Sequence, residues 1–297
     1  MFKNLYIFKL IEAPLVEIEA SLIPFAFMPA GATQEQSIGW VPPRGQEHGA
    51  LHETVAGHGF MKLMIETKSV PADAIARALE EQVKKIEQST GRKPGKKERR
   101  ELKDEIRLSL LPNAFSKRSA SLVWVNHQDG YIVIEASTQS KADIVVTQLV
   151  KSLEGLSIQL VNPKTSPGAA MAAWLLDSDN LPSDFTLDRK CDLMACDESK
   201  AKVKYANHPL DIEEVREHIA HGKMPTALAL TWNDRVSFVL TEGLQIKGVA
   251  FLDVVFEESA SKSDTAEDHF DADMAIATGE LSKMIPALIE ALGGEVV

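Results

Sequence analysis

The chain has 297 residues, of which 44% are hydrophobic and 25% charged, and its formal net charge is −11. This length allows a large core and two or three subdomains. Its apolar stretches are far shorter than the roughly 20 residues that cross a bilayer, and its N-terminus resembles no signal region. We therefore expect a cytoplasmic protein with no membrane partner. The two cysteines, Cys191 and Cys196, are too few for a four-ligand zinc site or a disulfide framework, so reduced thiols are expected.

The first part of the chain predicts two strands and a helix around a long connection. A short apolar run at 5–8 predicts a strand, and a helix is expected over 15–23, ended by prolines. Residues 31–59 are rich in glycine and proline, which indicates a long irregular connection of the kind that often carries function. The pattern of 61–70 is typical of a strand.

Two helices are predicted next, joined by a turn. Pro71 and Asp73 indicate a helix start, and one face is apolar because large aliphatic residues follow at helical spacing: Ile75, Leu79, Val83 and Ile86. Gly91 ends this helix, and a second one is expected from Lys96 to Leu111, before Pro112. Such a pair forms a helical hairpin that can project from a body.

The remaining residues predict alternating strands and helices. Asp129-Gly130, between two alternating runs in 119–137, is typical of a β-hairpin. Residues 162–187 contain several prolines around a short helical stretch and indicate a linker into a second unit. Further helices are expected at 142–153, 211–220 and 281–292, and further strands at 157–161, 190–205, 227–232, 236–241 and 245–251. The fold class predicted is α+β, with mixed or antiparallel sheets and flanking helices.

Basic residues concentrate in one segment of this acidic chain. Residues 84–118 contain twelve Lys and Arg against five Asp and Glu, a balance of +7. The rest of the chain has twenty basic and thirty-eight acidic residues, a balance of −18. Such asymmetry indicates a site for nucleic acid or another polyanion. The acidic remainder would repel DNA from the wrong face.

Helical geometry places the basic residues of the second helix on one face. At 100° per residue five of its six bases, all except Lys97, fall within about a third of the circumference, opposite the acids. Charges that only aid solubility are interspersed by sign, so the sorting favours sequence-independent binding of DNA backbone over the alternative, a solvated helix face. Aromatic platforms and known base-reading motifs are missing from the sequence. The candidate DNA-binding residues are Lys93, Lys96, Arg99, Arg100, Lys103, Arg107, Lys117 and Arg118.

Two other clusters could suggest metal chemistry. His48, His52 and His58 lie in the glycine-rich connection, where a regular helix is not expected, and His52-Glu53 is not followed by the second histidine of a zincin motif. Near the C-terminus five acids gather: Asp264, Glu267, Asp268, Asp271 and Asp273. An acidic loop is the simpler interpretation, and we expect no metal ligand and no cofactor.

The acidic cluster and the basic hairpin each suggest an alternative function. If Asp271 and Asp273 alternate on a short strand and share a face, they suit a metal-dependent nuclease. If the basic hairpin docks an acidic protein instead of DNA, the chain is an interaction scaffold. No Walker loop, dinucleotide fingerprint or nucleophile elbow occurs in the sequence, so an enzyme is not expected.

Several stretches, in this order and over essentially the whole chain, resemble the bacterial recombination-associated RdgC family. They are Phe2-Lys3-Asn4-Leu5, Gly39-Trp40-Val41-Pro42-Pro43, Leu102-Lys103-Asp104-Glu105, Leu110-Leu111-Pro112-Asn113-Ala114-Phe115-Ser116, Leu228-Ala229-Leu230-Thr231-Trp232, Phe270-Asp271-Ala272-Asp273, Thr278-Gly279-Glu280-Leu281 and Leu288-Ile289-Glu290-Ala291-Leu292-Gly293-Gly294-Glu295. Each motif is short, and their shared order makes the resemblance specific.

The resemblance implies a ring-shaped homodimer that binds DNA without marked sequence preference through a positively charged hole. It also implies competition with the strand-exchange protein RecA for DNA, a nucleoid-associated location, and neither enzymatic activity nor a cofactor. The implied units are a central domain from 1–71 and 119–165, a basic helical tip at 72–118, a second-unit base at 166–226, and the second half of the central domain at 227–297.

The sequence departs from the family pattern at a few positions. Arg118 stands where the resemblance leads us to expect an aromatic residue, Asn207-His208 replace a Lys-Gln pair, and Ala227 replaces a lysine. A contact that closes the tip, and DNA contacts of the second half, are therefore expected to differ from the family pattern.

Overall fold

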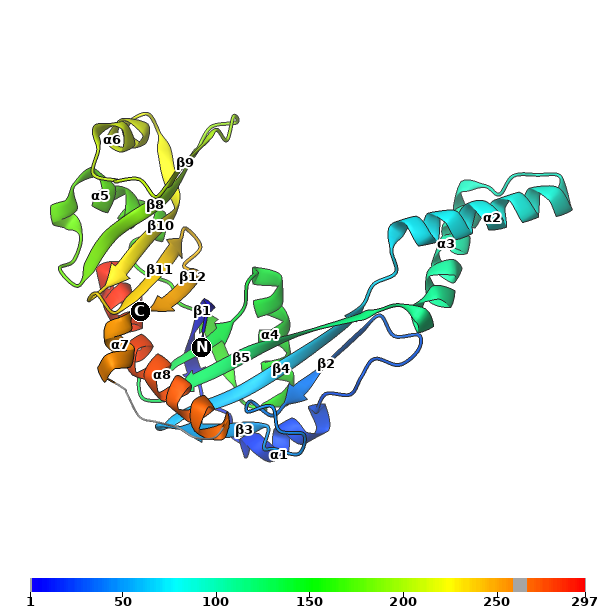
Figure 1. The fold of residues 1–297 in the computed structure, drawn as a ribbon, viewed down its shortest axis with the longest axis horizontal. Coiled ribbons are helices and arrows are strands. Elements are labelled where there is room, and N and C mark those ends of the chain that lie inside the picture. Colours follow the sequence, from blue (N-terminus) through cyan, green and yellow to red (C-terminus); the bar gives the residue numbers. More distant parts are fainter. Residues whose placement is uncertain (1, 259–265, 297) are drawn as a thin grey trace.

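The computed structural model describes residues 2–258 and 266–296, an α+β molecule built on one long sheet (Figure 1). Its strands are β1 Asn4–Glu12, β2 Gln36–Val41, β3 His52–Val55, β4 His58–Lys68, β5 Ser116–Asn126, β6 Tyr131–Glu135, β7 Ser157–Leu160, β8 Phe185–Ala195, β9 Lys202–Ala206, β10 Lys223–Trp232, β11 Val236–Thr241 and β12 Ile246–Phe251. Its helices are α1 Ile18–Leu22, α2 Ala72–Thr90, α3 Lys96–Leu110, α4 Gln139–Ser152, α5 Pro167–Leu176, α6 Glu213–Ala220, α7 Asp253–Glu258 and α8 Ala266–Ala291, with 3-10 helices at Ile23–Phe25, Leu111–Asn113 and Ser178–Asn180.

The sheet joins the two halves of the chain through its first strand. The strand order is β2-β4-β5-β6-β1-β12-β11-β10-β8-β9, with β3 added to β4 and β7 to β1. The neighbours pair antiparallel throughout this order. The expected α+β class is confirmed, and the described strands pair antiparallel, which decides between the mixed and antiparallel sheets predicted. The hairpin expected around Asp129-Gly130 is β5–β6.

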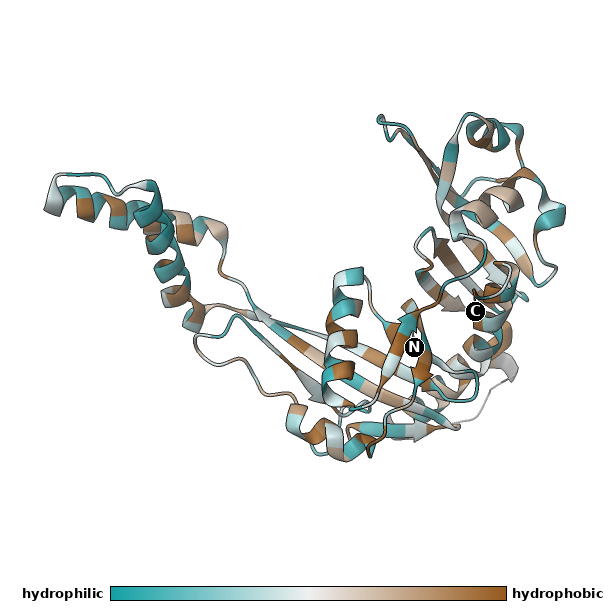
Figure 2. Ribbon diagram, turned by 180° about the vertical axis from the view of Figure 1, so that it is seen from behind, coloured by the Kyte–Doolittle hydropathy of each residue, from teal (hydrophilic) through white to brown (hydrophobic). Residues whose placement is uncertain are grey.

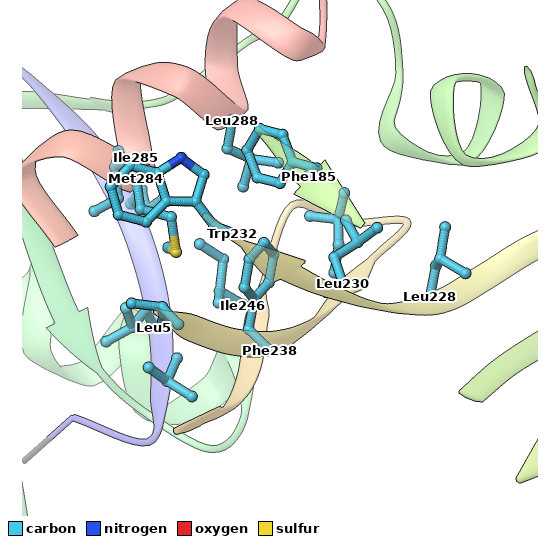
Figure 3. Packing of buried hydrophobic residues seen from close by; sticks show 14 of the residues in the cluster. Leu5, Phe185, Leu228, Leu230, Trp232, Phe238, Ile246, Met284, Ile285 and Leu288 are labelled. Atoms are coloured by element: carbon cyan, nitrogen blue, oxygen red, sulfur yellow. The ribbon is translucent and has the colours of Figure 1, made fainter. Parts of the chain in front are cut away.

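Two clusters of buried apolar side chains cover the sheet. One lies beneath α4 and includes Trp40 and Leu149. The larger one runs from the first half of the chain into the second, where Leu5 lies with Trp232 and with Met284 of α8 (Figure 3). Because burial of a large apolar side chain contributes about 1.5–3 kcal/mol, this shared core fixes the two halves to each other.

The connection predicted at 31–59 is in part regular structure, because it contains β2 and β3. Its glycine signal was misleading at Gly39, which lies inside β2 and pairs with Met64 of β4. A Cβ at this position would lie 2.4 Å from the Cα of Phe27, since the preceding segment crosses directly over the strand. The glycine therefore marks a close backbone approach and not a loop.

The linker predicted at 162–187 is also wrong, because α5 lies within it and is part of the larger core. Ser166 caps this helix by accepting from the Ala169 amide, and Pro167 occupies its first turn, as expected of a helix start. Met171 and Trp174 are buried. Pro167 thus begins a core helix and does not mark a linker between two units.

A long ribbon of β4 and β5, with β2 paired along the other edge of β4, carries the basic segment away from the body. β4 and β5 pair over ten residues, from Gly59↔Val125 to Lys68↔Ser116, and α2 and α3 lie at the far end of this ribbon (Figure 1). We call residues 72–110 the arm. The two predicted helices and the turn between them are present, and the helices lie at a steep angle to each other and not antiparallel (Figure 1). The arm and the β8–β9 end rise on the same side, which gives the molecule a concave outline (Figure 2).

Candidate nucleic-acid interface

The arm has a small apolar contact of its own. Ile75 of α2 and Ile106 of α3 are buried, and neither is part of the two clusters on the sheet. Gly91 ends α2 in the left-handed conformation, φ 69°, and its amide donates to the Glu87 carbonyl at 2.9 Å, as in a glycine C-cap. The chain then turns back and enters α3 after Gly95.

Four of the predicted DNA-binding residues stand exposed and unpaired on α3. Lys96, Arg99, Arg100 and Lys103 are exposed, and in the described part of the chain none of them has an ion-pair partner. Lys97, on the other side of the helix, lies 3.9 Å from Glu101. The helical sorting of charge inferred from the sequence therefore leaves the basic face open to an anionic partner.

Three of the predicted residues are already engaged by acids. The Lys93 ammonium lies 3.6 Å from Glu87, the Arg107 guanidinium 2.8 Å from Glu35, and the Arg118 guanidinium 3.1 Å from Glu66. Lys117 is exposed at the start of β5. The sequence showed the bases but not their partners, because Glu35 and Glu66 are distant along the chain.

A cavity of about 880 Å³ lies at the root of the arm, between α2, α3 and the ends of β2 and β4. Arg100, Lys103 and Arg107 line it, whereas Lys96 and Arg99 stand outside it. Three acids share the cavity with these bases: Glu35, Asp73 and Asp104. Three of the five bases of the predicted face thus line a cavity of mixed charge.

Arg118 is the most firmly held of the candidates. Its partner Glu66 is buried, and the carboxylate also accepts from the Ala30 amide at 2.7 Å. The Ala30 amide, followed by Ser116 and Arg118, holds the pKa of Glu66 below its usual value. The Arg118 guanidinium also lies over the ring of Phe27, 5.4 Å from its centroid. Arg118 therefore has a structural role near the end of the ribbon that carries the arm.

Among the residues that the structure describes, the acidic cluster does not form the site that a nuclease would need. Asp271 and Asp273 lie on α8, not on a strand as predicted, and two positions along a helix point about 200° apart. Asp271 Oδ1 lies 2.8 Å from Arg44 Nη1, so it is paired with a base. Asp264 and the side chains of Glu267 and Asp268 lie outside the described residues. Among those described, no three His, Cys, Asp or Glu groups converge as metal ligands would.

The histidines of the 31–59 segment are distributed over different elements. His52 lies on β3 and His58 on β4, while His48 is exposed between β2 and β3. Burial, more than any neighbouring charge, lowers the pKa of His52 and of His58 below the usual value. The His58 ring stands edge-on to Trp124, with centroids 5.4 Å apart. These contacts are those of packed, neutral imidazoles.

The second half of the chain presents two lysines that the sequence did not single out. Ala227 lines a cavity of about 590 Å³ on the sheet, together with Lys190 of β8 and Lys247 of β12. Both lysines are exposed and have no acid partner within the described residues. They belong to different strands, so no run of charge reveals them. Asn207 and His208 are exposed after β9.

Comparison with known proteins tests the resemblance seen in the sequence. The family model described as "RdgC: Putative exonuclease, RdgC" matches residues 1–295. The chain belongs to the RdgC family. Two relatives, each named "Recombination-associated protein RdgC", come from Dechloromonas aromatica (strain RCB), 39% identical over 100% of this chain and 98% of the relative, and from Cupriavidus necator (strain H16), 43% identical over 99% and 98%. A third relative of the same name, from Herminiimonas arsenicoxydans, is 42% identical over 99% of this chain and 98% of the relative.

Membership of the RdgC family confirms the identification made from the ordered motifs. It connects this chain to proteins named for an association with recombination, while the description of the family model names an exonuclease. Among the described residues, no helix of this RdgC-family chain has the length and apolar content needed to span a membrane.

Proposed function

We propose that this RdgC-family chain binds DNA through the phosphate backbone, with little sequence preference, and thereby limits the access of RecA to DNA during recombination. The observation that carries the proposal is the exposed α3 face, where Lys96, Arg99, Arg100 and Lys103 stand without an acid partner in the described structure. Four free cations on one rigid helix attract a polyanion and release its counterions.

The geometry of α3 suits a backbone better than a base edge. From Lys96 to Arg107 the helix rises about 16 Å at 1.5 Å per residue, a length over which duplex DNA presents several phosphates. The bases on this face are not interleaved with aromatic side chains, so stacking on unpaired bases is not supported. Lys190 and Lys247, which have no acid partner within the described residues, add positive charge on the sheet of the second half of the chain.

A homodimer closed around DNA, located at the nucleoid, completes the proposal. It is supported by the concave outline of the chain (Figure 2) and by apolar side chains exposed beside the arm. Phe115 is 93% exposed and Leu108 50% exposed, and large exposed apolar groups of this kind mark contact surfaces. A second copy meeting the first at the arm would cover them.

A charge-reversal pair tests the DNA site. Arg99→Glu with Lys103→Glu should weaken binding of a random duplex by about two orders of magnitude or more at moderate salt, because each reversal removes one phosphate contact and adds repulsion. The matched control, Lys97→Glu with Lys283→Glu, changes the net charge equally at positions away from this face. Equal losses in both pairs, or no loss in the first, would reject the site.

The nuclease alternative is tested in the same preparation. Because Asp271 is paired with Arg44 and points away from Asp273, a labelled duplex incubated with the protein and Mg²⁺ or Mn²⁺ should remain uncut. Cleavage that is lost in an Asp271→Asn, Asp273→Asn variant would establish the alternative instead.

A further inference from the structure

The cavity at the root of the arm holds a carboxylate against one of its arginines. Glu35 lies 72 positions before Arg107, yet Arg107 Nη2 donates to Glu35 Oε2 at 2.8 Å, and Nε lies 2.8 Å from Oε1. This two-point contact is the geometry in which a guanidinium binds a carboxylate or, equally well, a phosphate.

The main chain of Glu35 is held in place by the neighbouring strand. The Lys68 amide donates to the Glu35 carbonyl at 2.8 Å, and the next residue, Gln36, starts β2 and pairs with Thr67 of β4. Glu35 is therefore fixed at the edge of the sheet, facing α3 across the cavity. Its position relative to Arg107 depends on the ribbon and not on a free loop.

The other bases of the cavity have no such partner. Arg100 and Lys103 line the same space and lack an acid within ion-pair distance in the described part of the chain. Lys68 also lines the cavity, where its ammonium donates to a backbone carbonyl. Among the described residues the cavity thus combines two bases that lack an acid partner, Arg100 and Lys103, with Arg107, which Glu35 occupies. The side chains of Arg107 and Glu35 are 51% and 42% exposed, so an incoming phosphate has access to the pair.

We propose that Glu35 is a built-in competitor for the DNA backbone, whose carboxylate occupies the place at Arg107 that a phosphate takes when DNA binds. The inference rests on the function proposed above and adds a step to it: binding at the cavity exchanges a carboxylate for a phosphate. Because an exposed ion pair contributes little, the exchange is easily reversed. Glu35 consequently lowers affinity without closing the site.

The test compares two single substitutions that remove the same charge. Glu35→Gln should tighten binding of a random duplex by about two- to fivefold, the range expected when an exposed ion pair no longer has to be broken. Glu105→Gln, an exposed position on α3 with no acid–base partner within the described residues, is the control and should give a smaller gain. Circular dichroism checks that both variants are folded.

Arg107→Gln in each background completes a double-mutant cycle. If Glu35 competes at Arg107, this substitution should remove the gain of Glu35→Gln and should cost less in the original chain, where Arg107 is already engaged. A gain from Glu35→Gln no larger than that from Glu105→Gln would overturn the inference, as would equal costs of Arg107→Gln in both backgrounds. If the original chain and all variants fail to bind, the proposed function itself is rejected.

Discussion

At the scale of single residues, the acids decide which bases are available to an anionic partner such as the proposed DNA. Glu66 is buried, accepts from the Ala30 amide as well as from Arg118, and keeps its pKa low, so removing Arg118 would leave a buried charge unpaired, which is costly. Glu35 has no such second donor on its carboxylate in the described structure. Arg107 is therefore a displaceable base and Arg118 a fixed one, although both were predicted to contact DNA.

The pairing of these residues was beyond the reach of the sequence. Helical periodicity placed Arg107 on the basic face, but Glu35 lies 72 positions away and Glu66 lies 52 positions from Arg118. Both acids come to their partners only through the register of β2, β4 and β5, which a single sequence does not determine. Local charge counts therefore overestimated the number of free bases.

Two packed histidines give stability a dependence on pH. Burial lowers the folded-state pKa of His52 and His58, so the unfolded chain binds protons more readily than the folded one. Their contribution is fully present above the usual histidine pKa of about 6.5 and is lost as the pH falls below it. The urea midpoint should therefore fall between pH 7.5 and 5.5, and the fall should be smaller in His52→Gln, His58→Gln. An unchanged fall in this variant, or an equal reduction in the exposed control His48→Gln, would contradict the assignment.

At the scale of elements, the sequence located the two helices of the arm, but it did not locate every strand of the sheet or the full length of the helices packed against it. α2 and α3 were predicted nearly to their ends because aliphatic spacing and Gly91 act within the helices themselves. β2 was missed because Gly39 suggested a loop where it marks a close backbone approach. The short helical stretch expected within 162–187 is α5, but its prolines suggested a linker where Pro167 marks the start of a core helix. α8 was predicted only from 281 onward, since the alternation of Asp271 and Asp273 suggested a strand before it. The residues of α8 that are buried against the sheet recur at helical spacing, beginning with Met274, Ala277 and Leu281.

The arm should behave as a separate unit of local stability. Its buried residues lie outside both sheet clusters, and elements with few buried contacts open at low free energy. Ile106→Ala should therefore speed hydrogen exchange of the α2 and α3 amides by about tenfold or more, since truncating a buried isoleucine costs about 2–5 kcal/mol. The urea midpoint of the body should change little. A large shift of the global midpoint would show that the arm folds as one unit with the sheet.

At the scale of the whole molecule, the distribution of charge and the concave shape both favour the proposed DNA-binding surface. The segment 84–118 carries +7 in a chain of −11, and the structure places most of it on an arm that rises from one end of a concave molecule (Figure 1). Lys190 of β8 and Lys247 of β12, which have no acid partner within the described residues, lie in the other half of the chain. An acidic remainder then repels DNA from the other surfaces. The separation of charge along the chain could be predicted from the sequence, whereas the positions of the two basic regions in space follow only from the fold.

The proposed closure around DNA requires a dimer, because a single concave chain does not enclose DNA by itself. If a second copy meets the first beside the arm, sedimentation velocity should show a dimer, and Phe115→Ser should shift it toward monomer at micromolar concentration. Loss of an aromatic anchor from an interface commonly costs about 2 kcal/mol or more, which weakens association by about thirtyfold. Leu176→Ser, an exposed apolar position on α5 in the other half, is the matched control. A monomeric original chain, or equal effects of the two substitutions, would reject closure at the arm while leaving backbone binding by α3 untouched.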